Sequence, residues 1–224
     1  MRRIGVVATA LASILVFTAF HHPDPTTGTP PGPAEPVLEF RAPASRVTAA
    51  DLGRSWRPGC PVPVSRLRDL AVAYWSYAGT RRMGHAIVHQ DAVPDVREAF
   101  RRLYDRRFQI RQIIPVDHFG ASDSRSMRAN NTSAFNCRYV AGTTTWSQHS
   151  YGRAIDVNPV QNPYVDDGVA DPPGGQPWVD RSHGGPGMAL PHNVLREAFR
   201  AQGWGWGGTW TSAQDYQHFS ANNR

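Results

Sequence analysis

The sequence predicts a mixed α+β domain. Segments with strand and helix patterns do not alternate regularly along the chain, which argues against a parallel sheet. The 20 glycines and 19 prolines among 224 residues favour a loop-rich body over a helical bundle. No internal repeat of roughly 20–50 residues is visible, so solenoid and propeller folds are disfavoured.

The first half of the folded part contains the clearest patterns. Residues 66–77 are apolar and suit either a helix or a strand. Residues 83–89 have the alternation and the β-branched content of a strand. Residues 94–106 place apolar side chains at helical spacing, with arginines on the opposite face and Pro94 near the start. Residues 108–116 have the apolar pattern of a buried strand.

The second half is expected to contain more loop. A polar loop is predicted for residues 117–138, and a long loop rich in proline, glycine and aspartate for residues 158–187. Short strands are expected at residues 154–157 and 216–220. Between them, residues 192–202 have the pattern of an amphipathic helix that ends at a glycine.

The N-terminal part differs in composition from the rest. Two arginines precede an uncharged apolar run, residues 4–20, which is typical of a secretion signal or an N-terminal membrane anchor. No small-x-small cleavage pattern follows the run directly, so both interpretations stay open, beside a buried core helix. We expect a signal peptide or anchor over residues 1–21, a Pro-rich linker over residues 22–44 and one folded domain over residues 45–224.

The charged residues restrict the chemistry. All 24 basic residues are arginines, and the absence of lysine excludes lysine Schiff-base chemistry and a Walker-type phosphate loop. The net charge of +6 is modest. The basic residues show no patch interleaved with aromatic residues, so nucleic-acid binding is not expected. An anionic polymer such as a bacterial wall suits the charge equally well.

The two cysteines are too few for a four-thiolate metal site. In a chain with an export signal, Cys60 and Cys137 are expected to form one disulfide. If the chain is not exported, they are instead expected to be two free buried thiols.

Two histidines lie in segments that also contain an acidic residue. One segment reads Ser-Gln-His-Ser-Tyr-Gly-Arg-Ala-Ile-Asp and contains His149 and Asp156. The other reads Asp-Tyr-Gln-His-Phe and contains Asp215 and His218. Two imidazoles and one carboxylate are a ligand set that suits a catalytic zinc with one position open. The offset between His149 and Asp156 requires a turn, which Gly152 can supply.

The patterns Ser-x-His-x-x-Gly-x-Ala-x-Asp and Asp-x-x-His-Phe resemble those of a zinc peptidase family. This is the D-Ala-D-Ala carboxypeptidase and L-alanyl-D-glutamate endopeptidase family, which cleaves peptidoglycan stem peptides. The similarity extends over residues 126–138, the Asn-Pro pairs at 158–159 and 162–163, and the Trp-Gly run at 204–208. The resemblance implies a hedgehog-like zinc peptidase fold, with a small antiparallel sheet and flanking helices.

Carried over position by position, the resemblance implies roles for four residues. His149, Asp156 and His218 match the zinc ligands of the family, and Asp215 matches its catalytic acid/base. Many members have glutamate where this chain has Asp215. The shorter side chain is similar to the endolysin-like branch of the family.

The family also uses an arginine to stabilise the transition state. Its usual arginine motif is not present in this chain. Arg138 is therefore expected to take that role, with Arg128 and Arg125 as alternatives.

Together these observations predict a secreted or membrane-tethered zinc metallopeptidase of the bacterial wall. It is expected to be a monomer that hydrolyses stem peptides with metal-activated water, and residues 4–20 would be the tether. The alternative is a wall-binding module that keeps the fold and the metal without turnover. An intact Asp215 beside a complete ligand set favours the enzyme. The scissile bond, D-Ala-D-Ala or L-Ala-D-Glu, stays open.

Overall fold

The computed structural model describes residues 39–223. The predicted signal or anchor at residues 1–21 and most of the predicted linker at residues 22–44 lie outside this range. Within residues 39–223, none of the helices has both the length and the apolar character needed to cross a membrane.

The first sheet is antiparallel and has the strand order β1-β2-β3. It consists of β1 (Ala44–Arg46), β2 (Leu67–Trp75) and β3 (Arg81–His89). The apolar residues 66–77 therefore form a strand rather than a helix, because β2 pairs with β3 along its whole length. The predicted strand at residues 83–89 is confirmed, and it begins two residues earlier, at the start of β3.

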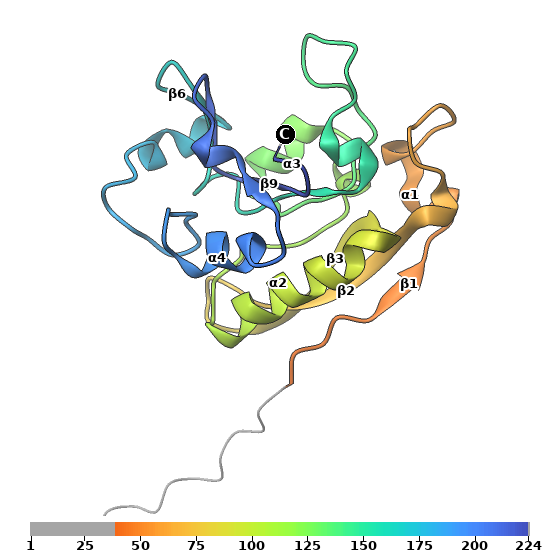
Figure 1. Cartoon of the computed structure of the whole chain (residues 1–224), viewed down its shortest axis with the longest axis horizontal. Helices are drawn as coiled ribbons and strands as arrows, with labels where there is room; N and C mark the ends of the chain where they lie inside the picture. The colour runs from red at the N-terminus through yellow and green to blue at the C-terminus, as the bar shows by residue number, and fades with distance from the viewer. Residues whose placement is uncertain (1–38, 224) are drawn as a thin grey trace, which may run out of the picture. The chain divides into compact units, whose positions relative to one another are not determined.

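Helix α2 (Val93–Asp105) covers one face of this sheet, as Figure 1 shows. It confirms the helix predicted at residues 94–106, with Pro94 in its first turn. The apolar stripe of the helix is buried against the sheet and consists of Val96, Ala99, Phe100 and Leu103. The spacing of the apolar residues, with a period of 3.6, thus predicts both that this segment is a helix and which of its faces is buried.

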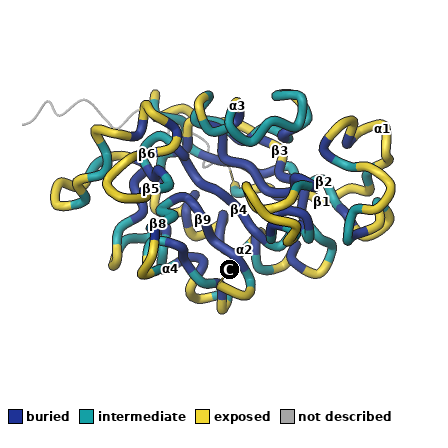
Figure 2. Tube along the Cα trace, turned by 90° about the horizontal axis from the view of Figure 1, so that it is seen from above, coloured by how far each residue is buried: buried dark blue, intermediate teal, exposed yellow. Residues whose placement is uncertain are grey.

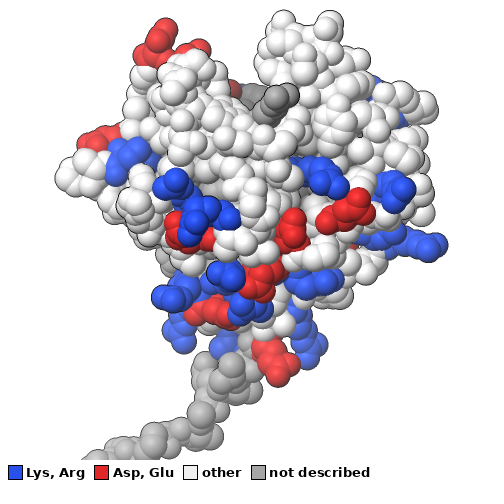
Figure 3. Space-filling view, in the orientation of Figure 1, with Lys and Arg blue, Asp and Glu red and all other residues white. Residues whose placement is uncertain are grey.

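The charged face of α2 is paired internally. Arg101 forms ion pairs with Glu98 and Asp105, and Arg102 forms one with Glu98 at 2.9 Å. Side chains three or four residues apart meet on a helix surface, so these pairs stabilise the helix slightly. Figure 3 shows basic and acidic groups intermingled on this part of the surface.

Residues 108–116 bury the side chains of Phe108, Ile110, Ile113 and Val116, but the prediction of a strand there is wrong. They form only isolated bridges, which pair Gln109 with Trp75 and Ile113 with Thr132. Two backbone N–H groups of this segment donate to side-chain amides instead of to a neighbouring strand. The Arg111 N–H donates to the Asn158 side chain at 3.0 Å. The Ile114 N–H donates to the Asn131 side chain at 2.9 Å.

The second sheet has the antiparallel order β4-β9-β7. It consists of β4 (Ala154–Asp156), β9 (His218–Ser220) and β7 (Gly205–Trp206). Strand β4 confirms the strand predicted at residues 154–157. The strand predicted at residues 216–220 is shorter than expected, because only its last three residues pair with β4.

The third sheet has the antiparallel order β6-β5-β8. Strands β5 (Tyr164–Asp166) and β6 (Val169–Asp171) form a hairpin inside the segment 158–187, which was expected to be loop throughout. Strand β8 (Gln214–Asp215) pairs with β5. The chain therefore changes sheets between β8 and β9, and this change separates Asp215 from the strand that contains His218.

Three further helices complete the fold. Helix α4 (Val194–Arg200) confirms the helix predicted at residues 192–202. Helix α3 (Asp123–Arg128) interrupts the segment 117–138, which was expected to be loop. Helix α1 (Ala49–Leu52) is a single turn. Each of the three helices has a side-chain cap, supplied by Thr48, Ser122 and Asn193.

The three small antiparallel sheets and their helices confirm the α+β class. Figure 2 shows the buried stretches meeting in the interior around β4 and β9. The larger hydrophobic cluster lies between the first sheet, α2, α4 and β9. A smaller cluster gathers around Leu52, Leu67 and Phe135 and includes Cys137.

Cys60 and Cys137 form the predicted disulfide, with their Cα atoms 5.9 Å apart and a sequence separation of 77. The bridge ties the loop after α1 to the segment that leads into Arg138. Closing a loop of this length removes chain entropy from the unfolded state, which is worth about 4–5 kcal/mol before any strain is subtracted.

Loss of this disulfide is expected to lower the free energy of unfolding by about 2–5 kcal/mol. The measurement is urea denaturation of the oxidised protein, the reduced protein and the Cys60→Ser, Cys137→Ser double variant. The reduced protein and the double variant should share a lower midpoint. Equal midpoints for the oxidised protein and the double variant would contradict the expectation.

Candidate metal centre

The three predicted ligands lie together in the interior. Asp156, at the end of β4, and His218, at the start of β9, are direct partners in the antiparallel pairing. His149 comes from a 3-10 turn, Gln148–Tyr151. Their side chains are almost inaccessible to solvent, since the three residues are only 3–6% exposed.

The donor atoms of these residues form a small triangle. His149 Nε2 lies 3.2 Å from His218 Nδ1 and 3.1 Å from Asp156 Oδ2. His218 Nδ1 lies 3.0 Å from Asp156 Oδ1. Among residues 39–223, this is the one cluster of three histidine, cysteine or acidic side chains whose geometry could hold a metal ion.

A turn brings His149 back to Asp156, as the spacing requires. Gly152 follows the 3-10 turn with a φ of +63°, a left-handed conformation that favours glycine. A Cβ atom at Gly152 would also lie 2.6 Å from the backbone nitrogen of His89. Glycine is therefore required twice at this position, by the turn and by the close approach of β3.

The segment 131–138 orients both ligand-bearing elements. Ser133 and Asp156 exchange two backbone hydrogen bonds of 3.0 and 2.9 Å. The His149 ring places Nδ1 2.5 Å from the carbonyl oxygen of Ala134. Because a carbonyl oxygen only accepts, Nδ1 carries a hydrogen, and Nε2 is the ring nitrogen that faces the other two candidate ligands.

The charge of Asp156 is stabilised by the two histidines. Burial alone would raise the pKa of its carboxyl group. The charges and hydrogen bonds of His149 and His218 outweigh burial and hold the pKa of Asp156 well below its ordinary value. The carboxylate is therefore ionised at neutral pH and available as a ligand.

Asp215 lies on β8, beside this triangle. Its Oδ1 atom is buried and has no hydrogen-bond partner among the described residues. Burial, and then the negative charge of Asp156, raise the pKa of Asp215 to about 7. The Trp-Gly run packs against it closely, because a Cβ atom at Gly207 would lie 2.9 Å from the Asp215 Cβ. A buried carboxyl group with a raised pKa and a free oxygen is suited to proton transfer.

The three candidate arginines have different surroundings. Arg125 is exposed and donates to the carbonyl of Phe119, and Arg128 is exposed and donates to Ser124 Oγ. The Arg138 side chain is only 29% exposed. Its backbone forms hydrogen bonds with residues before and after His149. The Arg138 N–H donates to Ser150 Oγ at 2.9 Å, and the Arg138 carbonyl oxygen accepts from the Ser147 N–H at 3.1 Å.

A residue that the sequence reasoning missed is Asp123, in the first turn of α3. Its Oδ2 lies 2.7 Å from Arg138 Nη2. Burial raises the pKa of Asp123, the Arg138 charge lowers it, and Asp156 raises it further. The signal in the sequence was weak, because the Ser-Asp pair that begins α3 lay within a segment expected to be loop.

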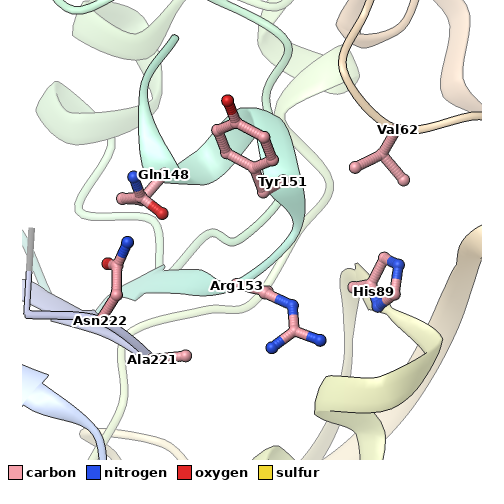
Figure 4. Close-up of a pocket in the computed structure, with 7 residues that line it drawn as sticks. All are labelled: Val62, His89, Gln148, Tyr151, Arg153, Ala221 and Asn222. Carbon is pink, nitrogen blue, oxygen red and sulfur yellow. The ribbon is translucent and has the colours of Figure 1, made fainter.

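A pocket of about 520 Å³ flanks the turn that contains His149. Gln148 and Tyr151 line it on one side, and His89 and Arg153 on another (Figure 4). The three candidate ligands do not line it. The pocket is therefore separate from the donor triangle.

The comparisons with known proteins bear on the C-terminal part of the domain. Residues 141–221 match a family model described as D-alanyl-D-alanine carboxypeptidase. Neither a comparison with curated proteins nor one with solved structures gave a match. The matched residues include the donor triangle and Asp215, while Asp123 and Arg138 precede them. The match confirms the resemblance carried by the motifs: over these residues the chain is similar to the D-alanyl-D-alanine carboxypeptidase family.

Proposed function

We propose that this protein is a zinc metallopeptidase that hydrolyses peptide bonds in peptidoglycan stem peptides. The observation that carries the proposal is the buried triangle of His149, Asp156 and His218 with a buried carboxyl group, Asp215, beside it. Both lie within the residues that match the peptidase family.

The triangle fits a zinc ion. Tetrahedral zinc sites have Zn–N and Zn–O distances of about 2.0–2.2 Å, so two ligand atoms are about 3.3–3.5 Å apart. Here the two histidine nitrogens are 3.2 Å apart, and each lies 3.0–3.1 Å from a different oxygen of the Asp156 carboxylate. Two neutral imidazoles and one carboxylate would leave a fourth position open, as in catalytic zinc sites. Zinc bound there would activate water and polarise the scissile carbonyl group.

Asp215 would act as the acid/base. Its unpaired Oδ1 can accept the proton of the attacking water and deliver it to the leaving amine. Its raised pKa of about 7 keeps proton gain and proton loss both accessible near neutral pH. Positive charge at the triangle would favour the ionised carboxylate, which is the form that a base requires.

Arg138 would stabilise the negative charge that develops on the scissile carbonyl oxygen. Its Nε atom is buried and has no hydrogen-bond partner among the described residues. A preorganised N–H donor in a water-poor site stabilises an oxyanion strongly. Arg125 and Arg128 are less suitable, since both are exposed and bonded locally.

The remaining parts of the proposal rest on the family resemblance and on the disulfide. We assign a hedgehog-like zinc peptidase fold, a monomeric state and an extracytoplasmic location, with residues 1–21 as signal or tether. A disulfide is typical of exported proteins, which supports this location. The description of the matched family favours the D-Ala-D-Ala bond. Aspartate at position 215 is similar to the endolysin-like branch of the family, so the L-Ala-D-Glu bond stays open as the alternative.

Digestion of purified muropeptides by the zinc-loaded full-length chain tests the function, with mass spectrometry of the products. Release of D-alanine would identify a carboxypeptidase, and separation of the stem after L-alanine would identify an endopeptidase. A chelator should abolish either reaction, and added zinc should restore it. If the zinc-loaded chain binds walls but leaves every muropeptide intact, it is a wall-binding module instead.

The metal assignment predicts that His149→Ala and His218→Ala each remove most of the bound zinc. Each substitution leaves two protein donors, one fewer than the three that catalytic zinc sites have. Zinc is measured by elemental analysis after dialysis, with the exposed histidine variant His183→Ala as the control. Stoichiometric zinc in the double variant His149→Ala, His218→Ala would rule out this site.

A further inference from the structure

Asp123 and Arg138 form an ion pair that connects α3 to the segment before the metal centre. The distance between Asp123 Oδ2 and Arg138 Nη2 is 2.7 Å, and the side chains are 27% and 29% exposed. Asp123 is not occupied by capping its own helix, because the side chain of Ser122 performs that role. Within residues 39–223, no other carboxylate forms an ion pair with Arg138.

The pair lies within electrostatic reach of the donor triangle. The charges of Asp156 and His149 both act on the pKa of Asp123. In turn, Asp123 contributes to the raised pKa of Asp215. The backbone of Arg138 is also fixed relative to the metal centre, because its hydrogen bonds join residues on either side of His149.

The hydrogen bonds of the Arg138 guanidinium group are incomplete. Within the described part of the chain, Nη2 contacts Asp123, and Nη1 makes only a long hydrogen bond of 3.4 Å to the carbonyl of Tyr139. Nε is buried and has no partner among the described residues. A buried N–H without a partner is unfavourable, and an oxygen atom supplied by a substrate would relieve this cost.

We propose that Asp123 is a positioning residue, which holds one edge of the Arg138 guanidinium so that its remaining N–H groups are oriented towards an anionic oxygen of the substrate. The inference rests on the proposed function, because it deepens the role given there to Arg138. Asp123 acts only through Arg138 and does not touch the reacting atoms. A guanidinium held at one edge by a carboxylate has fewer orientations to lose when the substrate binds.

The test is a double-mutant cycle in the zinc-loaded full-length chain, with a stem peptide as substrate. Arg138→Ala should lower kcat by about 10²–10³-fold, as expected for a lost oxyanion donor. Asp123→Asn should lower kcat by about 10-fold, with KM and zinc content unchanged. The double variant should be no slower than Arg138→Ala alone, because Asp123 has no target once Arg138 is gone. Asp105→Asn, which breaks an exposed arginine pair on α2, is the matched control.

Rescue with free guanidinium separates positioning from a merely structural role. Added guanidinium should restore part of the rate of Arg138→Ala in a saturable way. The Asp123→Asn, Arg138→Ala variant should need at least about 10-fold more guanidinium, because it lacks the carboxylate that holds the ion. Asp123→Glu keeps the charge and should retain most of the activity.

The outcomes separate this inference from the proposed function. If the wild-type chain cleaves no stem peptide, the proposed function is wrong and this inference falls with it. If the wild type is active, three results would overturn the positioning role alone. They are a wild-type kcat in Asp123→Asn, additive losses of kcat in the cycle, or equal guanidinium rescue of Arg138→Ala and of the double variant. Loss of zinc from Asp123→Asn would also overturn it, because the residue would then be structural.

Discussion

Replacing Asp215 by alanine is expected to lower the rate of stem-peptide cleavage by about 10²–10⁴-fold, while zinc content stays at the wild-type level. The size of the loss is that of a missing general acid–base. Zinc content should not change because Asp215 does not belong to the donor triangle. Asp215→Asn should show the same loss with less change of shape, since the amide cannot accept a proton. The measurement is kcat with a synthetic stem peptide, combined with elemental analysis of each variant.

These variants distinguish a role of Asp215 in proton transfer from a role in supporting the metal site. Asp215→Glu restores a carboxylate of the kind found at this position in many family members and should recover part of the rate. If Asp215→Ala and Asp215→Asn cleave at the wild-type rate, Asp215 is not the base. If both lose zinc in proportion to activity, Asp215 supports the metal site rather than the proton transfer.

The sequence predicted the members of the donor triangle, because each of them lies in a segment with a recognisable pattern. His149 and Asp156 are joined by a turn that one glycine allows, and Gly152 adopts the left-handed conformation this requires. His218 is the partner of Asp156 in two strands whose patterns were visible. The disulfide was also predictable, since the sequence begins with the pattern of an export signal and two cysteines allow only one intramolecular pairing.

The remaining features depend on contacts between distant segments, which a local pattern does not encode. Residues 108–116 have the apolar pattern of a strand, but the side chains of Asn131 and Asn158 occupy the positions of strand partners. The hairpin of β5 and β6 was hidden among prolines and glycines. Asp123 was missed for the same reason, because its importance comes from a contact with Arg138 across the fold.

The metal-free Asp215→Asn variant is expected to be more stable than the metal-free wild type at pH 8, by up to about 4 kcal/mol. The pKa of the Asp215 carboxyl group is raised from its ordinary value of 3.8 to about 7. The folded state therefore binds this proton more tightly than the unfolded state does. The resulting stability is complete below pH 3.8, declines as the pH rises and is lost above pH 7.

Asparagine has the shape of the protonated acid but does not titrate, so it avoids the cost of the buried charge. The stability difference between the variant and the wild type should grow by about 1.4 kcal/mol per pH unit between about pH 5 and 7, and level off above that range. Urea denaturation from pH 5 to 8.5 in the presence of a chelator measures the difference.

Asp167→Asn is the control, because Asp167 is exposed and its φ of +47° suits asparagine. A flat difference for Asp215→Asn would mean that Asp215 titrates as an ordinary carboxyl group and is not the buried acid of the site.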